Sequence, residues 1–182
     1  MNTSAQSPIP QPLLTALREL ILQGRQQVLR EVDAVQVHTY WQIGHHIVAY
    51  EQGGEARAAY GKRLLPQLAD VPTREFGRGF DASNLRYMRL FYQAFPICDA
   101  LRHELSWTHY RLLLRVDDAC AREWYMHEAA SQNWSTRALD RQVGTLYYER
   151  LLASADQASI VAEAQQNLAA LPATPVSSYA IR

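Results

Sequence analysis

The chain has 182 residues, of which 48% are apolar, so it can bury the core of one domain, with or without an appendage. Its formal net charge is zero, which excludes an overall attraction to nucleic acid or to an anionic membrane. Two cysteines, Cys98 and Cys120, are too few for a disulfide framework and do not have metal-ligand spacing. We therefore expect a cytoplasmic protein with reduced thiols.

The N-terminus shows no targeting signal. Residues 1–11 are polar and proline-rich, without the basic and apolar segments of a signal peptide, and are expected to form a disordered leader. The longest uncharged run, residues 34–50, contains three histidines and two glutamines, so it is not expected to cross a membrane. No membrane partner is expected.

The first half of the chain is predicted to be helical. Apolar residues spaced by three and four predict an amphipathic helix over residues 12–35, and a second periodic stretch covers residues 40–53. The pattern leaves open whether these are one bent helix or two. A third helix is predicted over residues 56–68, ending before Pro72 and followed by a loop over residues 73–80.

The second half continues this pattern. Asp81 or Ser83 is placed to cap a helix over residues 82–95. Further helices, the last one weaker, are predicted over residues 107–116, 118–132, 135–151 and 160–171. Ser106, Asp118 and Ser135 are expected to cap the first three, and Trp107 and Trp134, beside two of these caps, are expected to fill helix junctions. With no strand-like alternation, the sequence predicts an all-α, compact multi-helix domain over residues 12–152, then a linker helix and tail over residues 153–182.

Candidate catalytic residues are few. His38, His45 and His46 lie close together, but no cysteine or carboxylate stands at a spacing that would complete a zinc site. A nuclease of the PD-(D/E)XK kind needs an acidic residue two positions before its catalytic lysine. The only lysine is Lys62, and the residue two positions before it is Tyr60. We therefore expect no catalytic residue, no metal and no cofactor.

Arginine is the strongest compositional bias. Seventeen arginines accompany one lysine, and residues 74–115 hold seven arginines against four acids, a local net charge of +3. Helical spacing puts Arg86 with Arg89, and Arg111 with Arg115, on one side of a helix. Such a face suits phosphate contacts, because the guanidinium is a planar fork of donors. The alternative interpretation is a solvated surface with local ion pairs, in a chain from a GC-rich genome.

Several blocks of residues resemble a known family. They follow one another at residues 40–44 (YWQIG), 55–62 (EARAAYGK), 76–92 (FGRGFDASNLRYMRLFY), 105–114 (LSWTHYRLLL), 132–139 (QNWSTRAL) and 146–150 (LYYER). Together they are similar to the N-terminal domain of the YhcG family, over residues 12–171. The resemblance implies a domain that normally precedes a PD-(D/E)XK nuclease domain.

The same resemblance limits what can be carried over. Residues 162–171 are similar to the family's inter-domain linker, and the chain then stops at Arg182. The family's nuclease activity therefore cannot be assigned to any residue of this sequence. The sequence leaves open whether the chain is truncated or a stand-alone module. In either case the resemblance implies a tethered or separate nuclease domain as partner.

A fainter resemblance concerns residues 105–143, which are similar to the helical segment that follows the helix-turn-helix of ParB-type DNA-binding proteins. The matching positions are Leu105, Ser106, His109, Arg111, Leu113, Leu114, Ser135, Arg137 and Leu139. This resemblance implies that the helices over residues 56–68 and 82–95 form a helix-turn-helix-like element. The helix over residues 82–95, with Arg86 and Arg89, would then be the recognition helix.

These observations favour a DNA-binding or targeting module of a YhcG-type nuclease system, without catalytic activity of its own. The expected phosphate contacts are Arg78, Arg86, Arg89, Arg111 and Arg115. The alternative is a helical scaffold for self-association, as a homodimer, or for another protein. Its expected anchors are Tyr40, Trp41, Tyr147, Tyr148, Leu168 and Leu171. The sequence separates neither DNA from RNA nor one target site from another.

Overall fold

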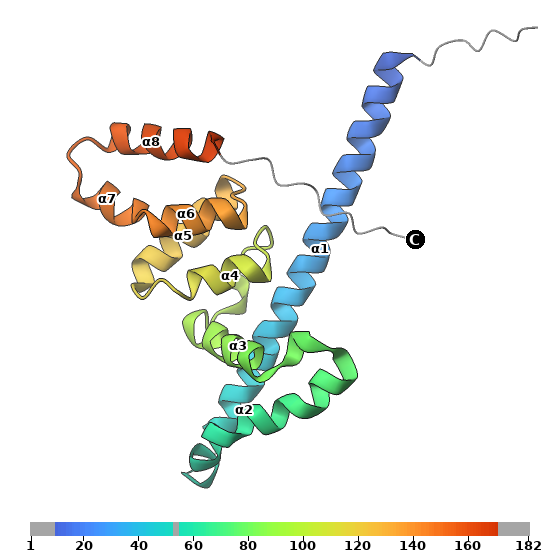
Figure 1. Cartoon of the computed structure of the whole chain (residues 1–182), viewed down its shortest axis with the longest axis vertical. Helices are drawn as coiled ribbons and strands as arrows, with labels where there is room; N and C mark the ends of the chain where they lie inside the picture. The colour runs from blue at the N-terminus through green and yellow to red at the C-terminus, as the bar shows by residue number, and fades with distance from the viewer. Residues whose placement is uncertain (1–9, 53–54, 171–182) are drawn as a thin grey trace, which may run out of the picture.

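The computed structural model describes residues 10–52 and 55–170, with the backbone alone for residues 55–64 and 78 (Figure 1). Within these residues the elements are α1 (Gln11–Glu51), α2 (Glu55–Phe76), η1 (Arg78–Phe80, a 3-10 helix), α3 (Ala82–Ala94), η2 (Cys98–Ala100, a 3-10 helix), α4 (Trp107–Leu113), α5 (Ala119–Ser131), α6 (Thr136–Gly144), α7 (Tyr147–Ala153) and α8 (Gln157–Ala169). No strand occurs among them, so the all-α prediction is confirmed. Of the leader predicted at residues 1–11, residues 1–9 lie outside the described residues and Gln11 already begins α1; the predicted tail from residue 171 also lies outside them.

One helix, α1, spans both periodic stretches near the N-terminus. No proline or glycine pair interrupts residues 13–51, so the helix continues where the sequence left two helices possible. Its C-terminal part is buried in the body of the domain at Val37, Tyr40, Gly44 and Ile47. Its N-terminal part extends away from the other helices (Figure 1). Among the described residues, no helix combines the length and apolarity that crossing a bilayer requires.

Helices α1 and α3 cross in close contact. A Cβ atom at Gly44 would lie 2.1 Å from the main-chain oxygen of Met88, so only glycine fits at this crossing. Helix α3 begins where the sequence predicted, because Asp81 Oδ1 accepts a hydrogen bond from the Asn84 amide at 2.8 Å. Its apolar face, with Leu85 and Met88, is buried.

Helix α2 is longer than predicted. It runs through Pro66 and Pro72 and ends at Phe76, so the prediction that it stops before Pro72 is wrong. Each proline removes only one main-chain donor, and the buried Leu65 and Ala69 hold the turn between the prolines against the core. The stop signal is Gly77, which takes φ +92° and whose amide donates to the Thr73 carbonyl at 3.0 Å. Residues 73–76 are therefore helix rather than loop.

The single helix predicted over residues 135–151 is also wrong, because the structure divides it into α6 and α7. Leu146 adopts φ 53° and ψ 47°, which a leucine rarely takes and which cannot continue an α-helix. The turn aims the Tyr148 amide at the hydroxyl of Tyr125 on α5, 3.0 Å away. It also buries Tyr147, while Leu146 itself is exposed.

Aromatic side chains fill the helix junctions. The buried ring of Trp107 lies with its centroid 5.0 Å from that of Tyr40 on α1 and 5.4 Å from that of Phe91 on α3. Its indole Nε1 donates to Asn84 Oδ1 at 3.1 Å. Trp134 is buried between α5 and α6, with its ring centroid 6.4 Å from that of Tyr147. The structure thus places both tryptophans at helix junctions, as expected.

Candidate nucleic-acid interface

A hollow of about 320 Å³ opens where η1 and the start of α3 meet α4. Its wall is mostly polar and aromatic, formed by Tyr40, Gly79, Asp81, Ser83, Asn84, Tyr87, Trp107 and Arg111. The Asn84 side chain holds the hollow together, because its Nδ2 donates to the Gly79 carbonyl at 2.5 Å and its Oδ1 accepts from Trp107. Elements distant in sequence therefore form one rigid rim.

Arg111 and Tyr87 form the most distinctive contact of this hollow. The guanidinium carbon of Arg111 lies 4.4 Å from the centroid of the Tyr87 ring. A guanidinium over an aromatic face is attracted by the ring quadrupole, and the stack leaves its N–H edge free to bind an anion. Arg111 is exposed, and Tyr87 is half-buried. The contact joins α3 to α4.

Arg86 precedes Tyr87 on α3 and is exposed. Among the described residues, Arg86 makes no hydrogen bond or ion pair, and Arg111 contacts only the Tyr87 ring. Two of the five predicted phosphate-binding arginines thus have no acidic partner in the part of the chain that the structure describes, and Arg111 lies over Tyr87. Of Arg78, in η1, only the backbone is described.

Arg89 and Arg115 have different surroundings. Arg89 Nη1 lies 3.1 Å from Glu51 Oε1, and the two side chains are only 30% and 18% exposed, so this pair ties α3 to the end of α1. Arg115 Nη1 lies 3.0 Å from Asp140 Oδ1 on the surface, between α4 and α6. Helical spacing in the sequence put Arg86 and Arg89 on one side of a helix as two candidate phosphate contacts. The structure separates them, because Arg89 has a half-buried partner.

Most of the ParB-like positions serve packing. His109 is buried, its Nδ1 accepts from the Ser106 amide at 3.1 Å, and its Nε2 donates to the Trp134 carbonyl at 3.0 Å. Burial lowers the pKa of His109, so the neutral ring is favoured. Leu105, Leu113 and Leu139 are buried around this junction. This block therefore explains how α4 packs against α6, whereas Arg111 and Arg137 remain on the surface.

The expected anchors of a scaffold are largely occupied within the chain. Tyr40 and Tyr147 are buried, and the indole of Trp41 donates to the Phe95 carbonyl at 2.7 Å. His45 stacks on Trp41, with ring centroids 5.9 Å apart. In the described part of the chain, no three histidine, cysteine or acidic residues are grouped so that they could hold a metal.

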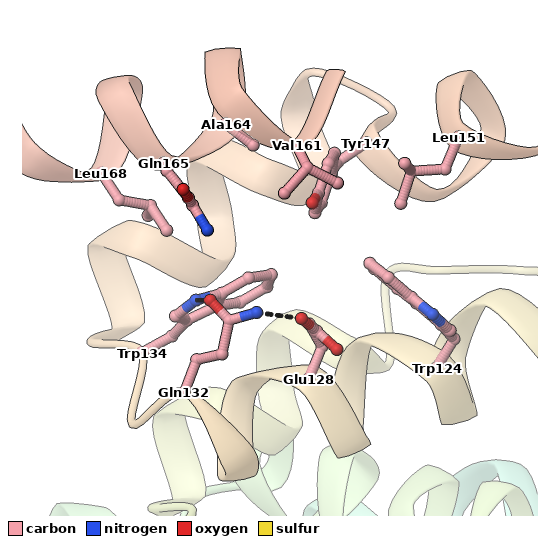
Figure 2. Close-up of a pocket in the computed structure, with 10 residues that line it drawn as sticks. All are labelled: Trp124, Glu128, Gln132, Trp134, Tyr147, Leu151, Val161, Ala164, Gln165 and Leu168. Atoms are coloured by element: carbon pink, nitrogen blue, oxygen red, sulfur yellow. Dashed lines mark hydrogen bonds between the residues drawn. The ribbon is translucent and has the colours of Figure 1, made fainter. Parts of the chain in front are cut away.

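A second cavity, of about 150 Å³, lies between α5, α7 and α8 (Figure 2). Trp124, Glu128 and Trp134 line it from below, and Ala164 and Leu168 face it from α8 above (Figure 2). The Glu128 carboxylate is held by a hydrogen bond from Gln132 Nε2. Leu168, expected in a self-association stripe, thus points into the body of this chain, and Leu171 lies outside the described residues.

Sequence reasoning missed Tyr87. Within its own helix it reads as one more aromatic residue, and its role depends on Arg111, which lies 24 positions later. The only local signal is an aromatic residue directly after an exposed arginine. Interleaved aromatic and basic residues are typical of nucleic-acid surfaces, but they are common elsewhere too.

Comparison of the sequence with those of known proteins places the chain in a family. The chain is 36% identical over 174 aligned residues to the Escherichia coli K12 protein named "Putative nuclease YhcG", in a match that covers 78% of this chain and 46% of the relative. The chain therefore spans about half the length of that relative. No solved structure matches. Residues 16–150 match the DUF1016 N-terminal domain, and the chain belongs to this family, as its resemblance to the YhcG N-terminal domain indicated.

Proposed function

We propose that this chain is a DNA-binding or targeting module of a YhcG-type nuclease system, without catalytic activity of its own. The observation that supports it best is the stack of Arg111 on Tyr87 in the wall of the polar hollow, with the exposed Arg86 next to Tyr87 in the sequence of α3. Among the described residues neither arginine has an acidic partner, and Arg111 lies over the Tyr87 ring. This combination suits the phosphates of a nucleic-acid backbone.

The proposed contacts divide by chemistry. Arg86 and the free edge of Arg111 bind phosphate oxygens, and Tyr87 holds the Arg111 guanidinium in place. Arg78, in η1, and the exposed Arg115, two residues after the end of α4, add longer-range attraction, since both positions adjoin the same helices. Arg89 contributes by fixing α3 rather than by direct contact. Phosphate contacts position a protein without reading sequence, so we propose a backbone-directed mode of binding.

In this proposal α2, η1 and α3 act as the helix-turn-helix-like element. The turn is short, from Gly77 to Asp81, and α3 presents Ser83 and Arg86 outward while Leu85 is buried. The DNA cleavage belongs to a nuclease domain, tethered or separate. Lys62 has Tyr60 in place of the acidic residue that a PD-(D/E)XK centre needs, which supports the assignment of catalysis to that partner.

The direct test is duplex binding by the purified chain across a range of salt concentrations. Binding through phosphates releases condensed counterions, so the logarithm of the affinity should fall linearly with the logarithm of salt concentration. Fluorescence anisotropy with labelled duplex and single-stranded DNA measures this slope. An affinity absent at ~50 mM salt, where electrostatic binding is strongest, would contradict the proposal.

A further inference from the structure

The N-terminal half of α1 carries an apolar stripe that no part of the described chain covers. The stripe consists of Leu14, Leu17, Ile21, Val28, Val32 and Val35, and is called here the α1 stripe. The exposed fraction of every member except Leu14 lies between 46% and 66%. The outward side of each of these residues is therefore in contact with water. Further apolar residues, Leu13 and Leu20, lie exposed at its edge.

A helix in this situation needs a partner. Residues 11–32 contact the body little, and Figure 1 shows them extending beyond the other helices. Isolated helices of this length are marginal in water, because stability comes mainly from packing an amphipathic face. The exposed stripe is therefore the surface that such packing would use.

The stripe has a definite geometry on the helix. At about 100° per residue its six members fall within an arc of about 60°. The side chains that bury α1 in the body, such as Val37, Tyr40 and Gly44, are centred about 140° around the helix from this arc. A second helix can therefore lie along the stripe, over a length of about 32 Å, without meeting the body of its own chain.

We propose that the partner is a second copy of this chain, with the two α1 stripes paired antiparallel. The spacing of the stripe is a palindrome: steps of three and four residues lead from Leu14 to Ile21, and steps of four and three lead from Val28 to Val35. Reversing one copy sets Leu14 opposite Val35 and Ile21 opposite Val28 of the other. The same alignment sets Leu17 opposite Val32, so every apolar residue meets an apolar residue.

The centre of the segment fits this alignment. Arg18 and Glu31 lie at equal distances from the midpoint but on opposite edges of the stripe, so the antiparallel pairing brings neither like nor opposite charges of these two residues together. Gly24 lies at the midpoint with open space around it, so two helices can approach closely there. Arg25, beside it, is exposed and can extend into solvent.

A second copy also fits better than a membrane surface. Helices that lie on membranes carry a strongly basic polar face, whereas residues 11–36 hold three arginines and three acids. Covering a stripe of this length on both copies removes on the order of 1,000 Å² or more of accessible surface, the size at which specific interfaces begin. A two-fold pairing uses the same patch on both subunits, as a self-complementary stripe requires.

The mass of the full chain in solution tests the proposal, by size-exclusion chromatography with light scattering. The expected mass is twice that of the 20.7 kDa chain. Replacing Ile21→Glu together with Val28→Glu buries charge in the pairing and should give the single-chain mass. The control is Gln23→Glu with Gln26→Glu, which adds the same charge on the opposite side of α1 and should keep the double mass. A wild-type chain that runs at 20.7 kDa over micromolar concentrations, or a control as monomeric as the stripe variant, would overturn the proposal.

Circular dichroism of the stripe variant separates lost pairing from lost folding. Both substituted residues are exposed in the single chain, so the thermal unfolding of the body should persist. Cysteine cross-linking in a chain with Cys98→Ser and Cys120→Ser tests the direction. Leu14→Cys should cross-link to Val35→Cys in a mixture of the two variants, and Val35→Cys should not cross-link to itself. Efficient self-linking of Val35→Cys would show a parallel pairing and overturn the antiparallel one.

Discussion

His109 Nε2 donates a hydrogen bond to the Trp134 carbonyl at 3.0 Å, and this contact fixes the start of α4 against the residue before the cap of α6. The other ring nitrogen, Nδ1, accepts from the Ser106 amide. A neutral imidazole with its proton on Nε2 satisfies both bonds, whereas a protonated ring would lose the bond from the Ser106 amide and keep only the Ser106 hydroxyl, 2.8 Å from Nδ1, as an acceptor. The junction therefore depends on an uncharged histidine.

The first prediction is a pH-dependent stability. Burial lowers the pKa of His109 below its ordinary 6.5, so the unfolded chain binds more protons than the folded one between the two values. The free energy of unfolding should therefore fall as pH drops below about 6.5. Asp33 is the acidic group coupled to this ring, and burial raises its own pKa. Its effect on the free energy of unfolding has the opposite sign but lies nearer pH 4.

Urea unfolding at intervals from pH 8 to pH 5 measures how the free energy of unfolding changes with pH. His109→Gln should flatten this dependence and the exposed His103→Gln should not; equal slopes in all three chains would refute the role of His109.

The second prediction concerns Gly44. Gly44→Ala should destabilise the fold by about 2 kcal/mol or more, because the new methyl group would overlap the Met88 carbonyl and force α1 from α3. Gly144→Ala is the matched control, since a Cβ there meets no atom within 4 Å. Thermal unfolding of both variants measures the difference. Comparable melting temperatures would mean that the helices do not cross as closely as described.

The third prediction distinguishes two arginines one helical turn apart. Arg89→Ala should lower the free energy of unfolding by about 1 kcal/mol, because it leaves Glu51 without its half-buried partner. Arg86→Ala should stay within about 0.5 kcal/mol, as expected for an exposed residue. A double-mutant cycle with Glu51→Gln isolates the pair. A coupling energy near zero would mean that Arg89 does not stabilise the fold through Glu51.

The fourth prediction concerns Trp107. Trp107→Ala should destabilise by about 3–5 kcal/mol, because it removes a buried ring that contacts α1, α3 and α4. Arg137→Ala, on the surface of α6, should change stability by no more than about 0.5 kcal/mol. Urea midpoints report both values. If the two variants unfolded at the same midpoint, the junction would not depend on the tryptophan.

The sequence predicted local features well where the deciding residues are neighbours. Asp118 and Ser135 were identified as caps, and Asp81 was one of two candidates with Ser83; the side chains of Asp81, Asp118 and Ser135 each accept the hydrogen bond of a cap. The expected stop at Pro72 was wrong, because packing of the adjacent turn outweighs one lost hydrogen bond. The break at Leu146 depends on Tyr125, which lies 21 residues earlier in the chain, so no local pattern indicates it.

The candidate site was predicted in its residue types but not in its grouping. Spacing along one helix puts Arg86 with Arg89, yet the partner of Arg89 comes from the far end of α1. Arg111 contacts Tyr87 rather than acting together with Arg115, which pairs with Asp140. Such contacts are set by how helices pack in three dimensions, and helical periodicity alone carries no information about them.

The measurement that tests the proposed function most directly compares salt slopes of duplex binding. Replacing Arg86 and Arg111 together by Ala should flatten the log–log slope by about two units, roughly one for each lost phosphate contact. The matched control replaces Arg25 and Arg137, which are exposed and remove the same charge from α1 and α6. The salt slope of duplex binding by this control should equal that of the unmodified chain. Equal flattening in both variants, or unchanged binding in the first, would contradict an interface at Arg86, Tyr87 and Arg111.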